Sequence, residues 1–311
     1  MERTSRRALL VQLAAQTVAT SATHPADKIG LAFGLYGMKS IATADALRLC
    51  AAIGYDGVEL PLMPGWKADP ALLGRAGRAE LRKLLAGLGL VVPAVMENLP
   101  YSPDPERRRV NLQRLKLAAE FGHDVSPAKP PVIDTILGAK ASQWDEMKGR
   151  LVDEMHRWAR TGQELETVIG MKPHAANAVN TPERALWILK QVGSPWLRIV
   201  YDYSHFFLEG LSLAATLKQL LPVAPFVSVK DSRGSDEKHE FLLPGEGRTD
   251  YIEYFRILKA ARYRGFVSVE VSSMIHNRPG YDPERTARKC YAFLAPLFAR
   301  AGVGQAPDLP R

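Results

Sequence analysis

The sequence predicts a single-domain α/β protein, a closed (β/α)8 TIM barrel. Short apolar runs of strand character alternate with amphipathic helices from residue 28 to about residue 301. The alternation repeats eight times over roughly 250 residues, the number of units at which a parallel sheet closes on itself. Several of the strands also end in a charged residue or a histidine, which is where such barrels carry their chemistry.

The expected strands are short apolar runs that stop at glycine, proline or a charged residue. In chain order they cover residues 28–33, 58–60, 91–96, 132–137, 167–171, 199–201, 226–229 and 266–271. Because each is followed by a helical segment rather than a tight hairpin turn, the strands are expected to pair in parallel. A doubly wound open sheet is the less favoured alternative, since Gly34-Leu35-Tyr36-Gly37 lacks the third glycine of a phosphate-binding turn.

The expected helices show an apolar face and, in several cases, a clear start signal. They cover residues 43–54, 69–88, 104–121, 142–160, 181–192, 212–221, 250–261 and 282–301. The pairs Asp69-Pro70, Asp104-Pro105, Thr181-Pro182 and Asp282-Pro283 place a capping side chain before a proline at the first helical position. Gly54 ends the first helix as a C-terminal glycine does.

Residues 1–26 are expected to be an export leader, residues 27–303 the barrel and residues 304–311 a C-terminal tail. Arg6 and Arg7 precede a moderately apolar segment that ends in small residues near Ala22, as in a twin-arginine signal. The alternative is an amphipathic N-terminal helix of a cytoplasmic enzyme. The segment is too short and too polar to span a bilayer, so we expect export to the periplasm without stable membrane association.

The overall composition is that of an ordinary globular protein with a basic balance. The chain has 311 residues, 46% of them hydrophobic, and a formal net charge of +8. Three arginines in the leader contribute to the excess, and most other basic residues are interspersed with acids on expected helix faces. No basic stripe is interleaved with aromatic residues, so nucleic acid is not an expected partner. Assembly into a homo-oligomer is left open.

The two cysteines, Cys50 and Cys290, belong to no Cys-x-x-Cys motif. They are expected on the first and last helices, which a closed barrel brings side by side. A disulfide between them is therefore conceivable, but two buried free thiols are favoured.

Nine titratable side chains are expected where strands end, and a barrel gathers these ends around one mouth. They are Glu59, Glu97, Lys172, His174, Asp202, His205, Lys230, Asp231 and Glu270. Any one of them alone is as well explained by a structural ion pair. Burying so many charges together costs several kcal/mol each unless they pair with one another, a metal or a substrate, so this rim is the predicted functional site. Glu59, Glu97, Lys230, Asp231 and Arg248 are the residues expected to bind substrate.

Four segments of the chain resemble the sugar phosphate isomerase/epimerase group of the xylose-isomerase-like TIM barrels. They are residues 200–205, 229–231, 243–247 and 265–271, and the similarity in order and spacing covers residues 28 to 302. The superfamily includes inosose dehydratases, ketose 3-epimerases, hydroxypyruvate isomerases and endonuclease IV. The trinuclear zinc cluster of endonuclease IV needs extra histidines that this chain lacks at the matching strands, so DNA repair is not expected.

The resemblance implies a divalent metal held by Glu, Asp, His and Glu on strands five to eight. Asp202 and Glu270 match two of these positions, and His205 matches the imidazole that commonly follows the Asp. Lys172 and Ser228 stand where the other ligands are expected; an ammonium repels a cation, and a hydroxyl is a weak ligand. Either one metal (Mn, Zn or Mg) binds in a shifted site built from Asp202, Glu270 and His205, or the site works without a metal.

The resulting prediction is an isomerase, epimerase or related lyase that acts on a small sugar or keto-sugar by proton abstraction next to a carbonyl. Glu270 is the expected base, Lys172 or a metal the stabiliser of the developing oxyanion, and His205 or His174 the proton relay. The alternative is a catalytically inactive carbohydrate-binding barrel that has lost its metal site. Nothing in these residues specifies the sugar, or distinguishes an isomer from a dehydrated product.

Overall fold

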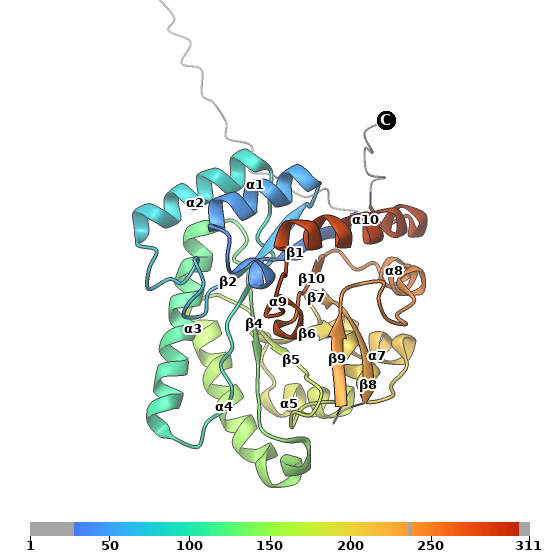
Figure 1. Ribbon diagram of the computed structural model, residues 1–311. Coiled ribbons are helices and arrows are strands. Elements are labelled where there is room, and N and C mark those ends of the chain that lie inside the picture. Colours follow the sequence, from blue (N-terminus) through green and yellow to red (C-terminus); the bar gives the residue numbers. More distant parts are fainter. Residues whose placement is uncertain (1–27, 236–237, 305–311) are drawn as a thin grey trace, which may run out of the picture.

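The fold is a closed barrel of eight parallel strands surrounded by helices, seen in a computed structural model that describes residues 28–235 and 238–304 (Figure 1). The strands are β1 (Gly30–Gly34), β2 (Gly57–Pro61), β3 (Ala94–Met96), β4 (Val132–Ile136), β5 (Ile169–Lys172), β6 (Leu197–Asp202), β7 (Phe226–Val229) and β10 (Phe266–Val269). Strand β10 closes the barrel on β1. The predicted (β/α)8 barrel is confirmed. The expected leader and residues 305–311 of the expected tail lie outside the described residues.

The larger helices pack around the outside of the barrel (Figure 1). They are α1 (Thr43–Ile53), α2 (Arg75–Leu88), α3 (Pro105–Val125), α4 (Trp144–Glu164), α5 (Pro182–Val192), α7 (Leu213–Leu220), α8 (Tyr251–Ala260) and α10 (Pro283–Ala301). The predicted caps at Asp104, Thr181 and Asp282 are present, each side chain accepting a hydrogen bond from a backbone N–H of the first turn. In the described part of the chain, no helix combines the length and the apolar character needed to cross a bilayer.

One predicted helix start is wrong. Asp69-Pro70 was expected to begin a helix, but α2 begins at Arg75. The Asp69 side chain instead accepts a hydrogen bond from the backbone N–H of Ala71 (3.0 Å) and pairs with Arg114 (2.8 Å) on α3. Asp69 therefore stabilises a turn and an ion pair with α3, and it does not cap a helix.

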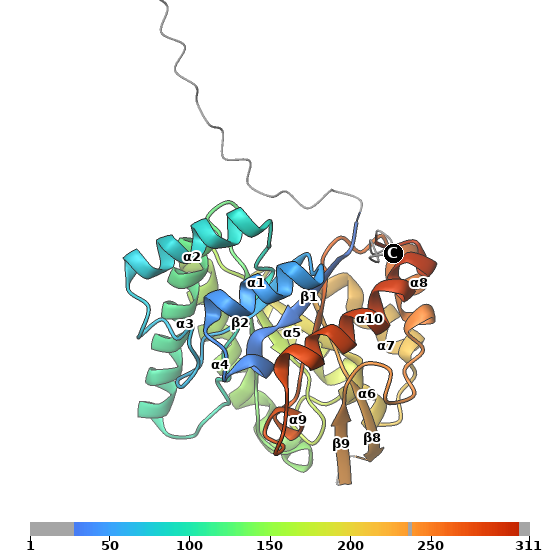
Figure 2. The same ribbon diagram turned by 45° about the horizontal axis from the view of Figure 1, so that its top comes forward.

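Short elements that the sequence did not reveal lie between the main strands and helices. They are the helices α6 (Tyr203–Leu208) and α9 (Ser273–His276), the hairpin β8 (Asp231–Ser235) to β9 (Lys238–Leu242), and the 3-10 turns η1 (Leu35–Met38), η2 (Ala141–Gln143) and η3 (Leu221–Val223). Figure 2 shows the hairpin and α9 at the same end of the barrel. The ring of Phe241 on β9 lies 5.0 Å from that of His205, so the hairpin covers part of the C-terminal mouth.

The barrel interior is apolar at the bottom and charged at the top, because successive side chains on a strand alternate between inside and outside. The bottom layer packs Ala32, Ala94, Val200, Phe226 and Phe266 together. Two residues further along β6 comes Asp202, and the steps of two after Phe226 and Phe266 lead to Lys230 and Glu270. The same period therefore builds an apolar floor and a polar mouth from the same strands.

Both cysteines are free and buried, Cys50 on α1 and Cys290 on α10. Burial raises the pKa of each thiol to about 12. A thiol must ionise to react as a nucleophile, so the native protein is expected to resist iodoacetamide at neutral pH. Mass spectrometry should find both cysteines alkylated only after guanidinium unfolding; rapid labelling of either one in the native protein would contradict this burial.

Candidate active site

Five charged side chains form one ion-pair chain at the C-terminal mouth of the barrel: Asp134, Lys172, Glu270, Lys230 and Asp202, in that order. The Nζ atom of Lys172 lies 2.6 Å from Asp134 Oδ2 and 2.6 Å from Glu270 Oε2. The Nζ atom of Lys230 lies 2.9 Å from Glu270 Oε1 and also pairs with Asp202 Oδ2. Acid and ammonium groups thus alternate along the chain. Glu270, at its centre, is 12% exposed, while its two lysine partners are nearly inaccessible.

The local fold of each strand end fixes where these groups point. Glu270 directly follows β10, and its backbone N–H donates to the carbonyl of Val229 (3.0 Å). Asp202 ends β6 and caps α6, since its Oδ1 accepts from the backbone N–H (3.0 Å) and the hydroxyl (2.7 Å) of Ser204. These bonds leave Oδ2 of Asp202 free to face Lys230, so one carboxylate both caps a helix and closes the ion-pair chain.

The ion pairs counteract the effect of burial on the pKa values of Lys172 and Glu270. Burial alone would lower the pKa of Lys172, but the charges of Asp134 and Glu270 raise it well above its ordinary value. Burial alone would raise the pKa of Glu270, but Lys172 and Lys230 together hold it well below the usual range. In this arrangement Glu270 is a stable carboxylate and only a weak base.

Glu59 on β2 lies beside Asp134, and its pKa is shifted in the opposite direction to that of Glu270. Burial, and then the charge of Asp134, raises the pKa of Glu59 well above its ordinary value of 4.5. Two adjacent carboxyl groups in a dry interior do not both ionise. Burial and the charge of Asp134 thus both favour the protonated form of Glu59, next to the ion-pair chain.

The two histidines of the predicted relay stack on each other, with ring centroids 3.8 Å apart. Burial lowers the pKa of His174 to about 4, and burial together with His174 and Lys230 lowers the pKa of His205 well below its ordinary value. Nδ1 of His205 accepts the backbone N–H of Ala175 (3.3 Å), and its Nε2 lies 3.3 Å from Lys230 Nζ and 3.7 Å from Asp202 Oδ2. His205 is buried, and His174 is the half-exposed member of the pair.

Glu97 is predicted to bind substrate, but the structure places it in a different ion-pair cluster. Arg114 on α3 donates to Oε1 of Glu97 (3.1 Å from Nε) and to Asp69 Oδ1 (2.8 Å from Nη1). This cluster ties α3 to the loop after β2. It gives Glu97 a structural explanation that does not involve the ion-pair chain.

Asp231 and Arg248, also predicted to bind substrate, lie in the segment that follows β7. Oδ2 of Asp231 accepts the backbone N–H groups of Gly245 (2.8 Å) and Gly247 (3.0 Å), so this carboxylate braces the loop after β9. Arg248 is exposed on that loop. Both residues shape the covering of the mouth rather than its charged centre.

Asp134 is the member of the ion-pair chain that was not predicted from the sequence. The structure pairs Lys172 with Asp134 and Glu270, and it pairs Asp202 with Lys230. Asp134 lies inside β4 rather than at its end. A carboxylate two residues after the inward-facing Val132 was the available signal.

Aromatic side chains from three other segments, η1, the loop after β2 and α9, form the rim beside Glu270. Tyr36 stacks on Trp66 with centroids 5.1 Å apart and planes 14° apart, and His276 meets Tyr36 edge-on at 4.8 Å. Burial, and then the charge of Glu270, raises the pKa of Tyr36 above its ordinary value. This rim, which the sequence did not reveal, offers flat apolar surface next to the charged centre.

The divalent metal implied by the family resemblance does not fit these residues. Each oxygen of Glu270 faces an ammonium group, and Oδ2 of Asp202 faces Lys230, so the carboxylates are neutralised by the protein's own cations. Ser228 is fully buried and supplies only a hydroxyl. Among the described residues, no group of three or more His, Cys, Asp or Glu side chains is arranged to hold a metal ion.

A family model confirms the relationship that the fold suggests. The model of the xylose isomerase-like TIM barrels matches residues 47–297. The chain belongs to this family. The fructoselysine 3-epimerase of Escherichia coli O157:H7 is 23% identical over 257 residues, covering 78% of this chain and 90% of that protein. The inosose dehydratase of Geobacillus kaustophilus is 24% identical over 251 residues, covering 71% of this chain and 77% of that protein.

A solved structure of another protein shares the barrel fold of this chain. A structure of the IOLI protein with a bound zinc atom has a TM-score of 0.71 and 20% identity, covering 90% of this chain and 100% of that one. The zinc belongs to that protein. At this identity the comparison establishes a shared barrel, and the donor groups of the present chain differ in chemistry from a zinc site.

The neutral state of Glu59 predicts a pH-dependent effect of Glu59→Gln. Above about pH 4.5 the unfolded chain releases this proton while the folded protein keeps it, so rising pH favours unfolding of the wild type. Glutamine does not titrate, so the variant lacks this pH-dependent contribution to the free energy of unfolding. The free energy of unfolding of the variant, measured by urea titration, should therefore rise relative to wild type as the pH increases above about 4.5. The same substitution at exposed Glu120 serves as control, and an equally pH-independent difference at both sites would contradict a protonated Glu59.

Converting the two mismatched positions should create a metal site. Lys172→Glu with Ser228→His replaces an ammonium by a carboxylate and a hydroxyl by an imidazole, giving the oxygen and nitrogen donors that zinc prefers. We expect about one zinc per chain in the double variant by elemental analysis, with a melting temperature that EDTA lowers. Lys172→Glu alone is the matched control. Stoichiometric zinc in the purified wild type would refute the mismatch.

Proposed function

We propose that the protein is a sugar epimerase or isomerase that moves a proton next to a carbonyl and uses lysine ammonium groups to stabilise the charge on oxygen. The observation that carries the proposal is the pairing of both oxygens of the partly exposed Glu270 with Lys172 and Lys230. Relatives named as fructoselysine and D-psicose 3-epimerases and as inosose dehydratases support sugar chemistry of this type.

The ammonium groups supply what the developing enediolate needs. Removing a proton next to a carbonyl places negative charge on the carbonyl oxygen, and preorganised cations in a dry site stabilise that charge strongly. Lys172 is held between two acids and is nearly inaccessible. Its position is thus fixed before a substrate arrives, so little reorganisation is required in the transition state.

Glu270 is the proposed base, and substrate binding is the step that makes it basic. Its pKa is low because two ammonium groups surround it. If a carbonyl or hydroxyl oxygen of the sugar takes over one of these ammonium contacts, the carboxylate loses part of its stabilisation and its pKa rises. Binding of the correct substrate is then coupled to activation of the base.

The proton returned to the substrate has two candidate sources at the mouth. Neutral His174 is half-exposed and stacks on His205, so it can relay a proton at the surface of the site. Glu59 carries a proton below the chain, next to Asp134. Epimerisation and isomerisation both require a deprotonated base that removes a proton and a protonated acid that returns one.

The proposed substrate is a small polyhydroxy carbonyl compound without an obligatory phosphate. Apolar faces of sugar rings pack on aromatic side chains, and the stacked Tyr36 and Trp66 lie beside Glu270. The proposal includes export to the periplasm through the twin-arginine leader predicted from the sequence.

The direct test is deuterium exchange. Incubated in heavy water with a panel of ketoses and aldoses, the wild type should wash deuterium into one substrate, detected by NMR, and EDTA should leave the rate unchanged. Glu270→Gln should abolish the exchange, and Lys172→Met should slow it about 100-fold or more, the cost of removing one oxyanion-stabilising group.

Exposed Lys148 on α4 provides the matched control for the lysine variant, since Lys148→Met changes the same charge far from the mouth. Thermal melting checks that Lys172→Met still folds. An unaffected rate in a folded Lys172→Met protein would discard the oxyanion role. Saturable sugar binding without any exchange would establish the alternative of a non-catalytic binding barrel.

A further inference from the structure

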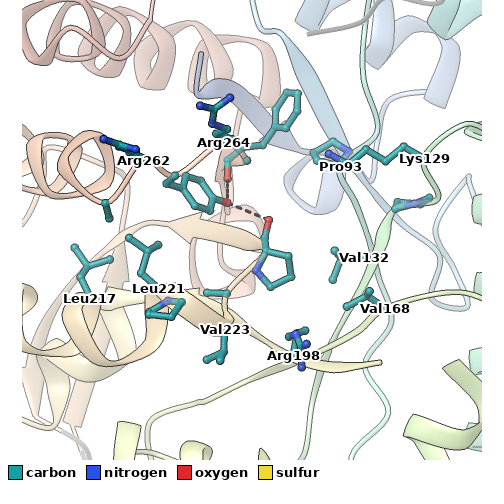
Figure 3. Close-up of a pocket in the computed structure, with 18 of the residues that line it drawn as sticks. Pro93, Lys129, Val132, Val168, Arg198, Leu217, Leu221, Val223, Arg262 and Arg264 are labelled. Atoms are coloured by element: carbon teal, nitrogen blue, oxygen red, sulfur yellow. Dashed lines mark hydrogen bonds between the residues drawn. The ribbon is translucent and has the colours of Figure 1, made fainter. Parts of the chain in front are cut away.

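A cavity lies at the opposite end of the barrel from the ion-pair chain. Its volume is about 880 Å³, within the range of small-molecule sites. Val132 and Phe266, the first residues of β4 and β10, form part of its floor, together with residues from the α8–β10 loop and from α7 and η3 (Figure 3). The apolar bottom layer of the barrel separates this cavity from Glu270.

The walls of the cavity are apolar and poor in hydrogen-bond donors. Five of the lining residues are prolines, which have no backbone N–H: Pro93, Pro130, Pro131, Pro222 and Pro225. The hydroxyl of Tyr263 is already used, since it donates to the backbone carbonyls of Pro225 (3.1 Å) and Phe266 (3.0 Å). Such walls suit a hydrocarbon body and do not suit the hydroxyls of a sugar.

The rim of the cavity is basic on several sides. Lys129, Arg198, Lys218, Arg262 and Arg264 line it, and no aspartate or glutamate is among the described lining residues. Figure 3 shows the four labelled cations arranged around the apolar floor rather than clustered at one point. The guanidinium of Arg198 is held in place by the carbonyls of Ser194 (3.1 Å) and Leu197 (3.0 Å). An anion at the rim therefore meets positive charge without a competing carboxylate from the lining.

Arg262 occupies a backbone conformation that favours glycine. Its φ is 54°, at the position just after the C-cap of α8, where its N–H donates to the carbonyl of Lys259 (2.9 Å). A left-handed conformation costs a side-chain-bearing residue about 1 kcal/mol relative to glycine. Glycine would adopt this turn with less strain. The arginine side chain is thus placed at the rim at a conformational cost.

We propose that this cavity binds an amphipathic carboxylate with an unbranched hydrocarbon body, a fatty-acid-like anion. The hydrocarbon lies against the proline-rich walls, and the carboxylate meets the rim cations, with Arg262 among them. This site is independent of the sugar chemistry proposed for the other end of the barrel, and it accounts for an apolar cavity whose charged lining residues are all basic.

The test is fluorescence titration with cis-parinarate, a fluorescent fatty acid, and with its neutral methyl ester. The wild type should bind one parinarate, with the ester about tenfold weaker. Arg262→Gly with Lys218→Gln should weaken parinarate binding about tenfold, the summed effect of two exposed ion pairs. Because glycine suits the left-handed backbone, Arg262→Gly alone should not lower the melting temperature.

Two further variants locate the site. Ala261→Trp, at a lining residue with ordinary helical backbone angles, should block binding by filling the cavity without unfolding the protein. Glu270→Gln at the other mouth and Lys116→Gln on the exposed face of α3 should both leave binding unchanged. Equal affinity for acid and ester, or wild-type binding in Ala261→Trp, would overturn the proposal.

Discussion

The structure of the active site depends on Glu270 being held by two ammonium groups at once. Ionised groups lose several kcal/mol of hydration when they are buried, and only well-placed partners compensate for this loss. The alternating order Asp134, Lys172, Glu270, Lys230, Asp202 gives every buried charge an opposite neighbour. Two lysines carry the same total charge as one divalent cation, but each ammonium is tethered to its own strand end. The barrel mouth thus partners each of these five side chains with an oppositely charged one from the protein itself.

This arrangement links stability and reactivity in one set of contacts. A carboxylate fully neutralised by two cations is stable and unreactive, which suits a resting site. Lysine side chains have flexible four-carbon stems and donate in three directions, so an ammonium can keep one acid partner while it contacts a substrate oxygen. A ligand that competes for Lys172 or Lys230 weakens the hold on Glu270, and the carboxylate becomes more basic only when the site is filled.

The strand-helix alternation and the Asp-Pro and Thr-Pro starts were sufficient to predict the barrel, because they report local preferences. The strand-end rule also located Lys172, Asp202, His205, Lys230 and Glu270, which the structure gathers at one mouth. The rule could not separate these from Glu97 and Asp231, since the partners that engage those two, Arg114 and the Gly245–Gly247 backbone, come from distant elements. The strand-end rule did not identify Asp134, because this residue lies inside β4 and its role depends on the register of that strand.

The ion pairs at the charged mouth depend on the apolar layer beneath them. Ion pairs of the kind around Glu270 are strong only where water is excluded, because the attraction between charges falls as the local dielectric constant rises. Val200, Phe226 and Phe266 fill the barrel beneath the charged mouth and close the path by which water could enter from the lower cavity. Packing at the bottom of the barrel is therefore part of what keeps Lys172 and Lys230 paired at the top.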